Sequence, residues 1–283
     1  MVTVEGIAQM SMLSQKARKE GRFIALVPTM GFLHEGHLSL IRRASQVGDL
    51  VVVSIFVNPS QFGPGEDYEA YPQDLDRDKR LAEVNGTDIL FSPSVEEMYP
   101  QGYGTWVDVE ELTEVLCGRS RPGHFRGVTT VVTKLFHITQ PHYALFGQKD
   151  YQQAQVIKRM VEDLNFDLKV LVEPTVREPD GLAMSSRNLY LSSQERKDAA
   201  VLYQSLLKAQ ELVWGGERDA GRVKDLIREM IAGKKRAKID YVSIVDGESL
   251  RPLSKLKGKV LIALAVKVGK ARLIDNLLLS IDG

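Results

Sequence analysis

Two histidines stand three residues apart in the stretch PTMGFLHEGHLSL, which begins at Pro28. His34 and His37 follow an apolar run and precede an amphipathic one, so they fall where a strand gives way to a helix. Residues three apart lie on the same face of a helical turn. The N–H groups at a helix N-terminus attract phosphate, and imidazoles beside them could stabilise charge as a phosphoryl bond breaks. The motif therefore predicts a phosphate-handling site.

Three other interpretations of this pair are open. A zinc site would need further ligands, and His-Glu-Gly-His differs in spacing from the His-Glu-x-x-His of zinc proteases. A dinucleotide loop would carry Gly-x-Gly-x-x-Gly, which this stretch lacks. The histidines could also merely cap a helix. That last interpretation weakens because polar clusters recur at comparable places along the chain.

Two of these clusters follow later apolar segments. Asn58 and Gln61, in VNPSQF, come after a second predicted strand, although Asn-Pro is also ordinary turn chemistry. The cluster that follows the short strand at residues 143–146 consists of Gly147, Lys149, Asp150 and Gln153. A lysine at the start of a helix could pair with phosphate, or it could be a solvated surface group.

Two arginine-containing segments could also bind an anion. MSSRN, residues 184–188, places two hydroxyl groups beside an arginine, whose fork of donors suits phosphate. GRSRPGHFRGV, residues 118–128, combines three arginines with glycine and histidine before a predicted helix. The first could equally be a polar loop between domains, and the second a surface loop.

The elements that must position these groups alternate along the first part of the chain. Strands are predicted at 23–27, 50–57, 87–93, 143–146 and 167–176, and helices at about 37–49, 71–86, 128–139 and 150–165. The first strand is expected to stop at Pro28, and Gly48 fits the end of the next helix. This alternation predicts an α/β fold, a Rossmann-like doubly wound parallel sheet. Its ligands bind beyond the carboxyl ends of the strands.

The pattern changes near residue 177. A long helix is expected from Ser192 or Ser193, where SSQE resembles a capping box, to about residue 216. A helix at 222–232 and strands at 239–246, 259–269 and 271–280 complete a smaller α+β unit. The predicted domains are therefore residues 1–176 and residues 177–283.

Composition limits the classes of function. Lys plus Arg and Asp plus Glu both number 37 in 283 residues, so the basic excess of a general nucleic-acid binder is absent. The single cysteine, Cys117, permits neither an internal disulfide nor a cysteine-rich zinc site, and it suits the cytoplasm. No apolar run reaches the roughly 18 residues of a membrane span, and the N-terminal stretch has no signal-peptide core. We expect no nucleic-acid and no membrane partner.

Taken together, the motifs resemble those of one enzyme family. PTMGFLHEGH, NPSQF, GHFRGV, FGQKDYQQ and MSSRN, in that order, resemble the pantoate–β-alanine ligase family, within the adenylyl-transfer superfamily that includes class I aminoacyl-tRNA synthetases. The resemblance runs from about residue 20 to RLIDN near the C-terminus. One small departure is Phe32, which follows Gly31 where the family usually has alanine.

The resemblance implies a reaction in two steps. ATP and pantoate form pantoyl adenylate and pyrophosphate, and the amine of β-alanine then displaces AMP to give pantothenate. Mg²⁺ accompanies ATP. The family resemblance also implies a homodimer built through the N-terminal domain, with residues 1–176 binding nucleotide and pantoate and residues 177–283 forming a lid.

The resemblance further implies roles for individual residues. The residues implied to be catalytic are His34, His37, Lys149 and Arg187. Those implied to bind ATP are Met30, Gly36, His37, Gly147, Lys149, Asp150, Met184, Ser185, Ser186 and Arg187. Those implied to bind the other substrates are Gln61 and Gln153 for pantoate, Asn58 for β-alanine, and Arg126, which would contact either pantoate or the lid. Asp78, placed by spacing alone, would help to hold Mg²⁺.

Other functions remain open from the residues themselves. A nucleotidyltransferase would join a nucleotide to a phosphorylated small molecule, but the glutamines at 61, 152 and 153 favour a polyol acid over a phosphate ester. A synthetase fragment that acts on tRNA fits poorly with zero net charge. A nucleotide-sensing module without chemistry would not need both the imidazole pair and the Lys/Ser/Arg set.

Overall fold

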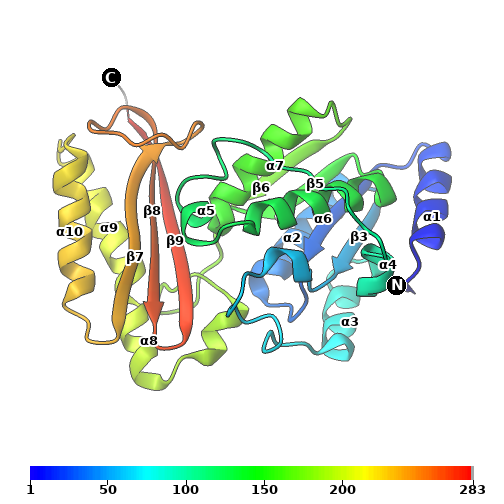
Figure 1. Ribbon diagram of the computed structural model, residues 1–283, viewed down its shortest axis with the longest axis horizontal. Coiled ribbons are helices and arrows are strands. Elements are labelled where there is room, and N and C mark those ends of the chain that lie inside the picture. Colours follow the sequence, from blue (N-terminus) through cyan, green and yellow to red (C-terminus); the bar gives the residue numbers. More distant parts are fainter. Residues whose placement is uncertain (282–283) are drawn as a thin grey trace. The chain divides into compact units, whose positions relative to one another are not determined.

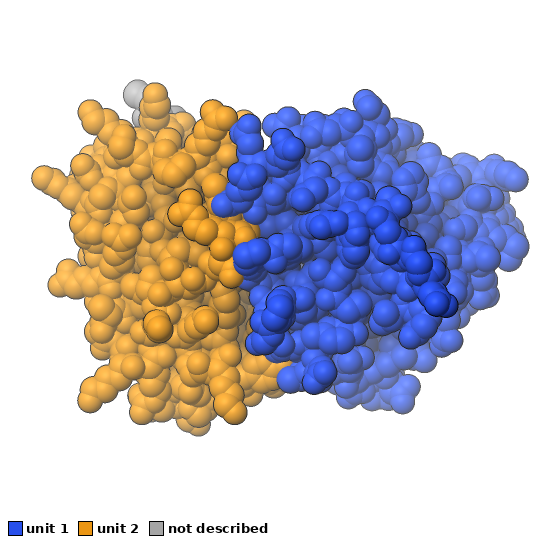
Figure 2. Space-filling model, in the orientation of Figure 1, with its two compact units in different colours: residues 1–114, 121–148, 153–174 blue, residues 115–120, 149–152, 175–283 orange. Residues whose placement is uncertain are grey.

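The computed structural model describes residues 1–281, which fall into two compact units (Figure 2). The first unit comprises residues 1–114, 121–148 and 153–174. The second unit comprises residues 115–120, 149–152 and 175 onward. The second unit thus takes in two short segments that lie inside the first unit in sequence. None of the helices in the described part of the chain has the length and apolar character needed to cross a bilayer.

A six-stranded parallel sheet forms the centre of the first unit (Figure 1). Its strands are β1 (Val2–Val4), β2 (Ile24–Thr29), β3 (Leu50–Ile55), β4 (Ile89–Phe91), β5 (Tyr143–Gly147) and β6 (Lys169–Glu173). Their order across the sheet is β1-β4-β3-β2-β5-β6. The chain moves outward from β2 through β3 to β4 and then returns to β5 on the other side of β2. This reversal defines a doubly wound sheet, and the predicted Rossmann-like fold is confirmed.

Helices follow most of these strands. They are α1 (Ile7–Lys19), α2 (Glu35–Val47), α3 (Leu75–Val84), α4 (Val95–Met98), α6 (His124–Thr139) and α7 (Tyr151–Asp163), with the short 3₁₀ segments η1 (Pro59–Gln61) and η2 (Gln148–Asp150). Gly48 ends α2, as predicted. Strand β1 and helix α1 were not predicted, because β1 has only three residues and α1 buries only Met10, Ser14 and Ala17.

The two faces of this sheet are covered by different helices. Alternate strand residues such as Ala25, Val27 and Val53 pack with Ile41 of α2 and Ala82 of α3 in one buried cluster. The intervening residues point to the opposite face because side chains alternate along a strand. Helices α1 and α6 contact β2 as well as each other. Burial on both faces explains the almost wholly apolar strands of the sequence.

The second unit is built on a three-stranded antiparallel sheet, β7 (Ala237–Asp246), β8 (Gly258–Val268) and β9 (Ala271–Ile281). Its helices are α5 (Cys117–Ser120), α8 (Ser193–Ala199), α9 (Val201–Trp214) and α10 (Ala220–Ala232), with the 3₁₀ segment η3 (Ser186–Tyr190). Helices α9 and α10 lie beside the sheet (Figure 1) and share its apolar core, which includes Leu206, Ile227 and Ile262. The predicted smaller α+β fold is confirmed.

The single long helix predicted after Ser192 is two helices. Ser192 caps α8 through the predicted box, since its hydroxyl accepts from Glu195 N and Glu195 accepts from Ser192 N. The chain then passes through Ala200 into α9. Helix α8 contacts β7 and β8, whereas α9 contacts β8, β9 and α10. The break follows these different packing partners, which no helical period in the sequence reveals.

Candidate active site

The sheet opens at the point where its strand order reverses. Strand β2 pairs with β3 as far as Thr29 opposite Ile55, and β5 pairs with β6 as far as Gly147 opposite Glu173. In contrast, β2 and β5 pair only at residues 25–26 with 143–144. The two central strands therefore carry no mutual pairing at their carboxyl ends. This is the switch point at which doubly wound folds bind ligands.

Pro28 lies inside β2, so the prediction that the strand stops there is wrong. Successive residues of a central strand form their backbone hydrogen bonds with the neighbouring strands on opposite sides. Ile24 bonds on the β5 side, with its N–H donating to His142 Nδ1, while the carbonyl of Thr29 accepts from Phe56 N on the β3 side. Pro28 is four residues from Ile24, so its backbone nitrogen also points toward β5. At that position β2 and β5 are no longer paired. The proline therefore removes no ladder hydrogen bond.

A tight loop leads from β2 into α2. Gly31 has a φ of 84°, and a Cβ on it would lie 3.0 Å from Ile55 and 3.1 Å from a carboxylate oxygen of Asp78. Phe32 has a φ of 49°, in the left-handed region that side chains seldom adopt. Arg77 lies over its ring at 4.8 Å. The loop therefore needs support from outside itself to keep this backbone shape.

Asp78 provides that support. Its side chain is 1% exposed, and its two carboxylate oxygens accept from Phe32 N at 2.6 Å and from Leu33 N at 2.7 Å. Burial raises the pKa of this carboxyl, although the hydrogen bonds from Leu33 and Phe32 and the nearby Arg77 act to lower it. Asp78 thus holds the backbone that leads directly into His34.

His34 is the N-cap residue of α2, and His37 lies in its first turn. Their rings stack with centroids 4.0 Å apart, and His34 N donates to His37 Nδ1 at 3.3 Å. Because Nδ1 of His37 accepts, a neutral His37 carries its proton on Nε2. Gly36 lies between the two histidines in the same turn. The structure therefore brings this pair to a helix N-terminus beyond the carboxyl end of β2, as predicted.

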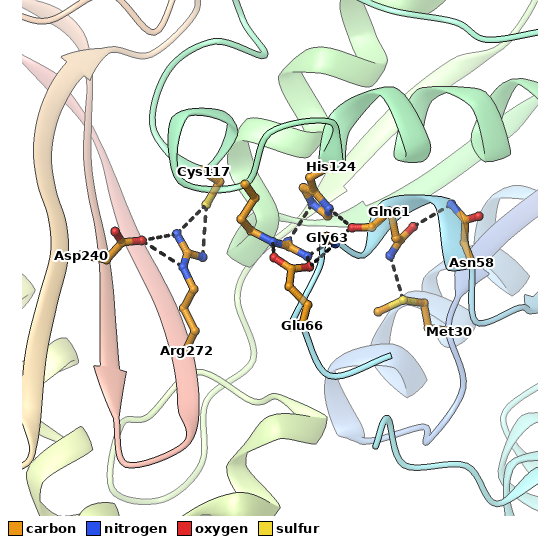
Figure 3. Close-up of polar contacts among 10 residues, drawn as sticks. Met30, Asn58, Gln61, Gly63, Glu66, Cys117, His124, Asp240 and Arg272 are labelled. Atoms are coloured by element: carbon orange, nitrogen blue, oxygen red, sulfur yellow. Dashed lines mark hydrogen bonds and ion pairs between the residues drawn. The ribbon is translucent and has the colours of Figure 1, made fainter. Parts of the chain in front are cut away.

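A second polar chain joins three predicted site residues (Figure 3). Gln61 Nε2 donates to the sulfur of Met30 at 2.8 Å, and Gln61 Oε1 accepts from Asn58 Nδ2 at 3.1 Å. Tyr99 Oη donates to Asn58 Oδ1 at 2.8 Å and lies 3.0 Å from the Ser60 hydroxyl. Burial raises the pKa of Tyr99 to about 12, so this tyrosine stays a neutral donor. Met30, Asn58 and Gln61 thus form one connected group.

Helix α6 packs directly on the segment that bears Asn58 and Gln61. Asn58 Nδ2 donates to the carbonyl of Gly127 at 3.1 Å, and His124 Nδ1 lies 2.8 Å from the carbonyl oxygen of Gln61. A Cβ on Gly127 would lie 2.3 Å from the carbonyl oxygen of Ser60. Only glycine permits so close an approach, so the GHFRGV and NPSQF motifs meet here.

An ion pair closes the loop that follows Gln61. Arg121 donates to both carboxylate oxygens of Glu66 at 2.6 Å, and its guanidinium lies 2.9 Å from His124 Nε2. Burial acts to raise the pKa of Glu66, but the bonds from Arg121 outweigh it and the pKa falls below its usual value. Gly63 N also donates to this carboxylate (Figure 3). Glu66 and Arg121 therefore support the backbone of Gln61.

The other predicted residues of the first unit have separate environments. Arg126 lies over the ring of Trp106 at 4.7 Å. Gly147 ends β5, and Gln153 is half-buried on α7. The contacts described for Arg126 and Gln153 thus join neither residue to the group around Gln61.

In the second unit, Lys149 and Asp150 are adjacent on η2. Lys149 Nζ lies 3.8 Å from Asp150 Oδ2, and the carbonyl of Lys149 accepts from Asn276 Nδ2 at 3.0 Å. The side chain of Lys149 is 20% exposed. A lysine so largely covered is not an ordinary solvated surface group, which was the alternative interpretation from the sequence.

The MSSRN segment follows an antiparallel turn. Met184 N donates to Val176 O at 3.0 Å, and Ser185 caps η3 by accepting from Arg187 N. Ser186 is 8% exposed. Asn188 donates to Glu178 at 2.6 Å, which ties the end of the motif back to the turn. The hydroxyls and Arg187 therefore stand on a compact, internally bonded segment.

Sequence reasoning missed two residues that support the site. They are Glu66 and Tyr99 in the first unit. Each lies near a recognised motif, but its partner is remote in sequence, as with Tyr99 and Asn58, 41 residues apart. Within residues 1–281, no group of three or more His, Cys, Asp or Glu side chains is arranged to hold a metal ion.

The fold and the switch point define the class, a Rossmann-like α/β protein. Comparison with known proteins narrows the class to a family. The profile of the family described as Pantoate-beta-alanine ligase matches residues 2–278. The pantothenate synthetase of Heliobacterium modesticaldum is 60% identical over 281 residues, which cover 99% of this chain and 100% of that protein. The chain therefore belongs to the pantoate–β-alanine ligase family of enzymes, amide-forming ligases of pantothenate biosynthesis.

Solved structures agree with this assignment. The pantothenate synthetase from Thermus thermophilus superposes with a TM-score of 0.94 at 48% identity, covering 98% of this chain and 99% of that one. The pantoate-beta-alanine ligase from Francisella tularensis, in complex with beta-gamma ATP and beta-alanine, has a TM-score of 0.81 at 37% identity. That alignment covers 98% of this chain and 97% of that one. The nucleotidyltransferase, tRNA-synthetase and sensor interpretations are set aside.

Proposed function

We propose that this ligase uses ATP and works through a pantoyl-adenylate intermediate. The observation that carries the proposal is the His34–His37 pair at the N-terminus of α2, beyond the carboxyl end of β2 at the switch point. A helix N-terminus with imidazole donors suits a phosphate that gains charge during transfer. Further support comes from the Francisella tularensis relative, whose crystal structure holds an ATP compound and β-alanine.

In the first step, a carboxylate oxygen of pantoate attacks the α-phosphorus of ATP. The bond from that phosphorus to the bridging oxygen breaks, and pyrophosphate leaves with the electron pair. His34 and His37 would donate to the phosphates and stabilise the charge on the transferring group. No covalent bond to the protein is needed, so positioning and charge stabilisation supply the rate.

In the second step, the neutral amine of β-alanine attacks the acyl carbon of the adenylate. The acyl–oxygen bond breaks, AMP leaves, and the nitrogen loses a proton as the amide forms. Adenylation makes this attack possible because a carboxylate itself is a poor acceptor of an amine. We propose that Asn58 lies near β-alanine and that Gln61, Gln153 and Arg126 bind pantoate.

The remaining residues are proposed to bind ATP. Lys149, Ser185, Ser186 and Arg187 would hold the triphosphate, since lysine and arginine offer charge and fixed donors to phosphate. Asp150 would contact the ribose. The residues that would shape the nucleotide site are Met30, Gly36, Gly147 and Met184.

Magnesium is proposed to enter with ATP. Mg²⁺ in nucleotide sites commonly keeps several waters and takes one or two carboxylates besides the phosphates. A single protein carboxylate would suffice for that mode. Asp78 would be the protein carboxylate, and its bonds to Phe32 and Leu33 leave lone pairs on each oxygen. The ion would neutralise phosphate charge.

The family resemblance supports three broader proposals. Residues 1–176 would bind nucleotide and pantoate, and residues 177–283 would act as a lid. Two copies would associate through the N-terminal domain, and light scattering after gel filtration would give twice the 31.6 kDa chain mass. The enzyme would work in the cytoplasm, where its single cysteine would stay reduced.

Isotope transfer tests the adenylate directly. Ligation is run with pantoate in which both carboxylate oxygens are ¹⁸O, and the ¹⁸O content of each product is measured by mass spectrometry. The adenylate route leaves one ¹⁸O in AMP and one in the amide of pantothenate. As a control, β-alanine with a labelled carboxylate should give unlabelled AMP. Label in inorganic phosphate, or unlabelled AMP from labelled pantoate, would rule out pantoyl adenylate.

A further inference from the structure

Hydrogen bonds within the second unit fasten the segment that bears Lys149. Asn276 Nδ2 donates to the carbonyl of Lys149 at 3.0 Å. Tyr151 Oη donates to the carbonyl of Gly247 at 2.6 Å. The amide of Gln152 accepts from Cys117 N at 2.9 Å and donates to Val115 O at 2.8 Å. Residues 149–152 are thus anchored from several directions, and the partners of Lys149 and Tyr151 belong to the C-terminal part of the chain.

Asn276 is well placed to fix the backbone of Lys149. It lies in the middle of β9, opposite Ala263 of the neighbouring strand, and is 4% exposed. A buried side chain on a paired strand has few alternative rotamers, so it transmits the position of the strand to its partner. The carbonyl of Lys149 is part of the peptide group that joins Lys149 to Asp150. Holding this peptide group in place sets the directions of the Lys149 and Asp150 side chains.

The neighbouring residue of β9 holds the other proposed phosphate-binding segment. Asp275, 2% exposed, accepts from both terminal nitrogens of Arg177 at 2.7 and 3.0 Å. Arg177 also donates to Gly181 O at 3.1 Å and lies 3.7 Å over the ring of Tyr203. These bonds fix the turn from which Met184 begins the MSSRN segment. Since adjacent strand residues face opposite ways, β9 can hold both segments at once.

We propose that Asn276 is a positioning residue for Lys149, and that Asp275 has the corresponding role for the segment at residues 184–187. This inference rests on the proposed function, in which both segments hold the triphosphate of ATP. Neither β9 residue touches substrate in the proposal. Their effect on the reaction passes through the backbone that carries Lys149 and the serines.

The test compares Asn276→Ala with the control Ser205→Ala. Ser205 is also fully buried in the second unit, and its hydroxyl donates to a backbone carbonyl, Leu202 O at 2.8 Å, within its own helix. We expect Asn276→Ala to lower kcat/KM for ATP about tenfold or more in pantoate-dependent pyrophosphate exchange, because misplacement by about 1 Å can cost about 100-fold. KM for pantoate should change little. Ser205→Ala should lower the unfolding temperature without this kinetic change.

Amide hydrogen exchange gives a readout that general destabilisation would not reproduce. Exchange at residues 149–152 should accelerate in Asn276→Ala while the strands of the first unit keep their protection. In Ser205→Ala the same amides should be unchanged. Wild-type kinetics and wild-type protection of residues 149–152 in a folded Asn276→Ala protein would overturn the proposal.

Tyr151→Phe keeps the proposal testable if Asn276→Ala does not fold. That change deletes one oxygen and, with it, only the hydrogen bond to Gly247. We therefore expect a smaller loss in kcat/KM for ATP than in Asn276→Ala. An unchanged kcat/KM for ATP in Tyr151→Phe would overturn the proposal. If the proposed function itself is wrong, the wild-type protein will bind ATP but show no pantoate-dependent pyrophosphate exchange. The positioning role is then tested by measuring ATP affinity by calorimetry. Equal affinity in the wild type and in Asn276→Ala would reject that role.

Discussion

At the scale of single residues, the site depends on a few groups whose surroundings set their chemistry. His37 accepts from His34 N through Nδ1, which leaves Nε2 as the nitrogen that carries the proton. Lys149 is largely covered, and its backbone is held by Asn276. The sequence predicted both residues from their types and places. It could not predict that Asn276 holds Lys149, because the two residues are 127 positions apart along the chain.

His34→Ala and Lys149→Ala should each reduce adenylation much more than stability. Loss of one donor to a transferring phosphate typically costs about 100- to 1,000-fold in rate, while neither side chain belongs to a buried apolar cluster. Pyrophosphate exchange and thermal unfolding measured on the same preparations would check this. His137→Ala, which alters an exposed histidine of α6, serves as the control. Near-normal exchange in both variants would contradict the assignment.

Asp78→Asn separates two roles of one residue. The amide would present N–H to one of the two backbone donors that the carboxylate now accepts, so the free energy of unfolding without nucleotide should fall by about 1–3 kcal/mol. If Asp78 also helps to hold Mg²⁺, the half-saturating Mg²⁺ concentration should rise. Asp76→Asn, an exposed change on the same helix, is the control. Unchanged stability would contradict the loop role, and an unchanged Mg²⁺ requirement would contradict the metal role.

At the scale of elements, close packing determines where the proposed substrate residues lie. The 3₁₀ segment η1 meets the first turn of α6 at Gly127, where no side chain would fit. Hydrophobic periods in the sequence predicted every strand except β1 and the longer helices except α1, and the SSQE motif predicted the capping box at Ser192. The path of β2 through Pro28 and the break at Ala200 were not predictable. The first depends on which strand pairs with β2 at Pro28, and the second on the different packing partners of α8 and α9. Sequence periodicity contains neither kind of information.

Gly127→Ala should weaken pantoate binding. The added methyl group would force Ser60 and the adjoining Gln61 away from α6, since an uncorrected Cβ would lie 2.3 Å from a backbone oxygen. We expect KM for pantoate to rise about tenfold, a typical cost of about 1.4 kcal/mol for a displaced hydrogen-bond partner, with a smaller change in KM for ATP. Gly104→Ala, where a Cβ meets only one atom at 3.9 Å, should leave both constants unchanged. An unaltered KM for pantoate in Gly127→Ala would exclude Gln61 as a contact of that substrate.

At the scale of the whole molecule, stability should depend on pH through a histidine outside the proposed site. His142 Nδ1 accepts from Ile24 N at the start of β2, and burial, followed by the charge of Arg18, lowers its pKa. The unfolded chain therefore takes up this proton first as the pH falls. The contribution of His142 is complete above about pH 6.5 and is lost as the pH drops toward the lowered folded-state pKa.

His142→Asn should remove this dependence. Asparagine keeps an acceptor for Ile24 N but does not titrate. Denaturant unfolding between pH 7.5 and 5.5, where carboxylates hardly titrate, would give the slope for each protein. We expect a shallower slope for the variant. Equal slopes would mean that His142 has the same pKa in the folded and unfolded chains.

The account as a whole is tested most directly by ATP–pyrophosphate exchange without β-alanine. Labelled pyrophosphate is incubated with enzyme, ATP, Mg²⁺ and pantoate, and label is followed into ATP. We expect exchange that requires both pantoate and Mg²⁺, because only a reversible adenylation of pantoate returns pyrophosphate to ATP. An enzyme that binds ATP and forms pantothenate, yet exchanges no label under these conditions, would contradict a free-standing pantoyl-adenylate step.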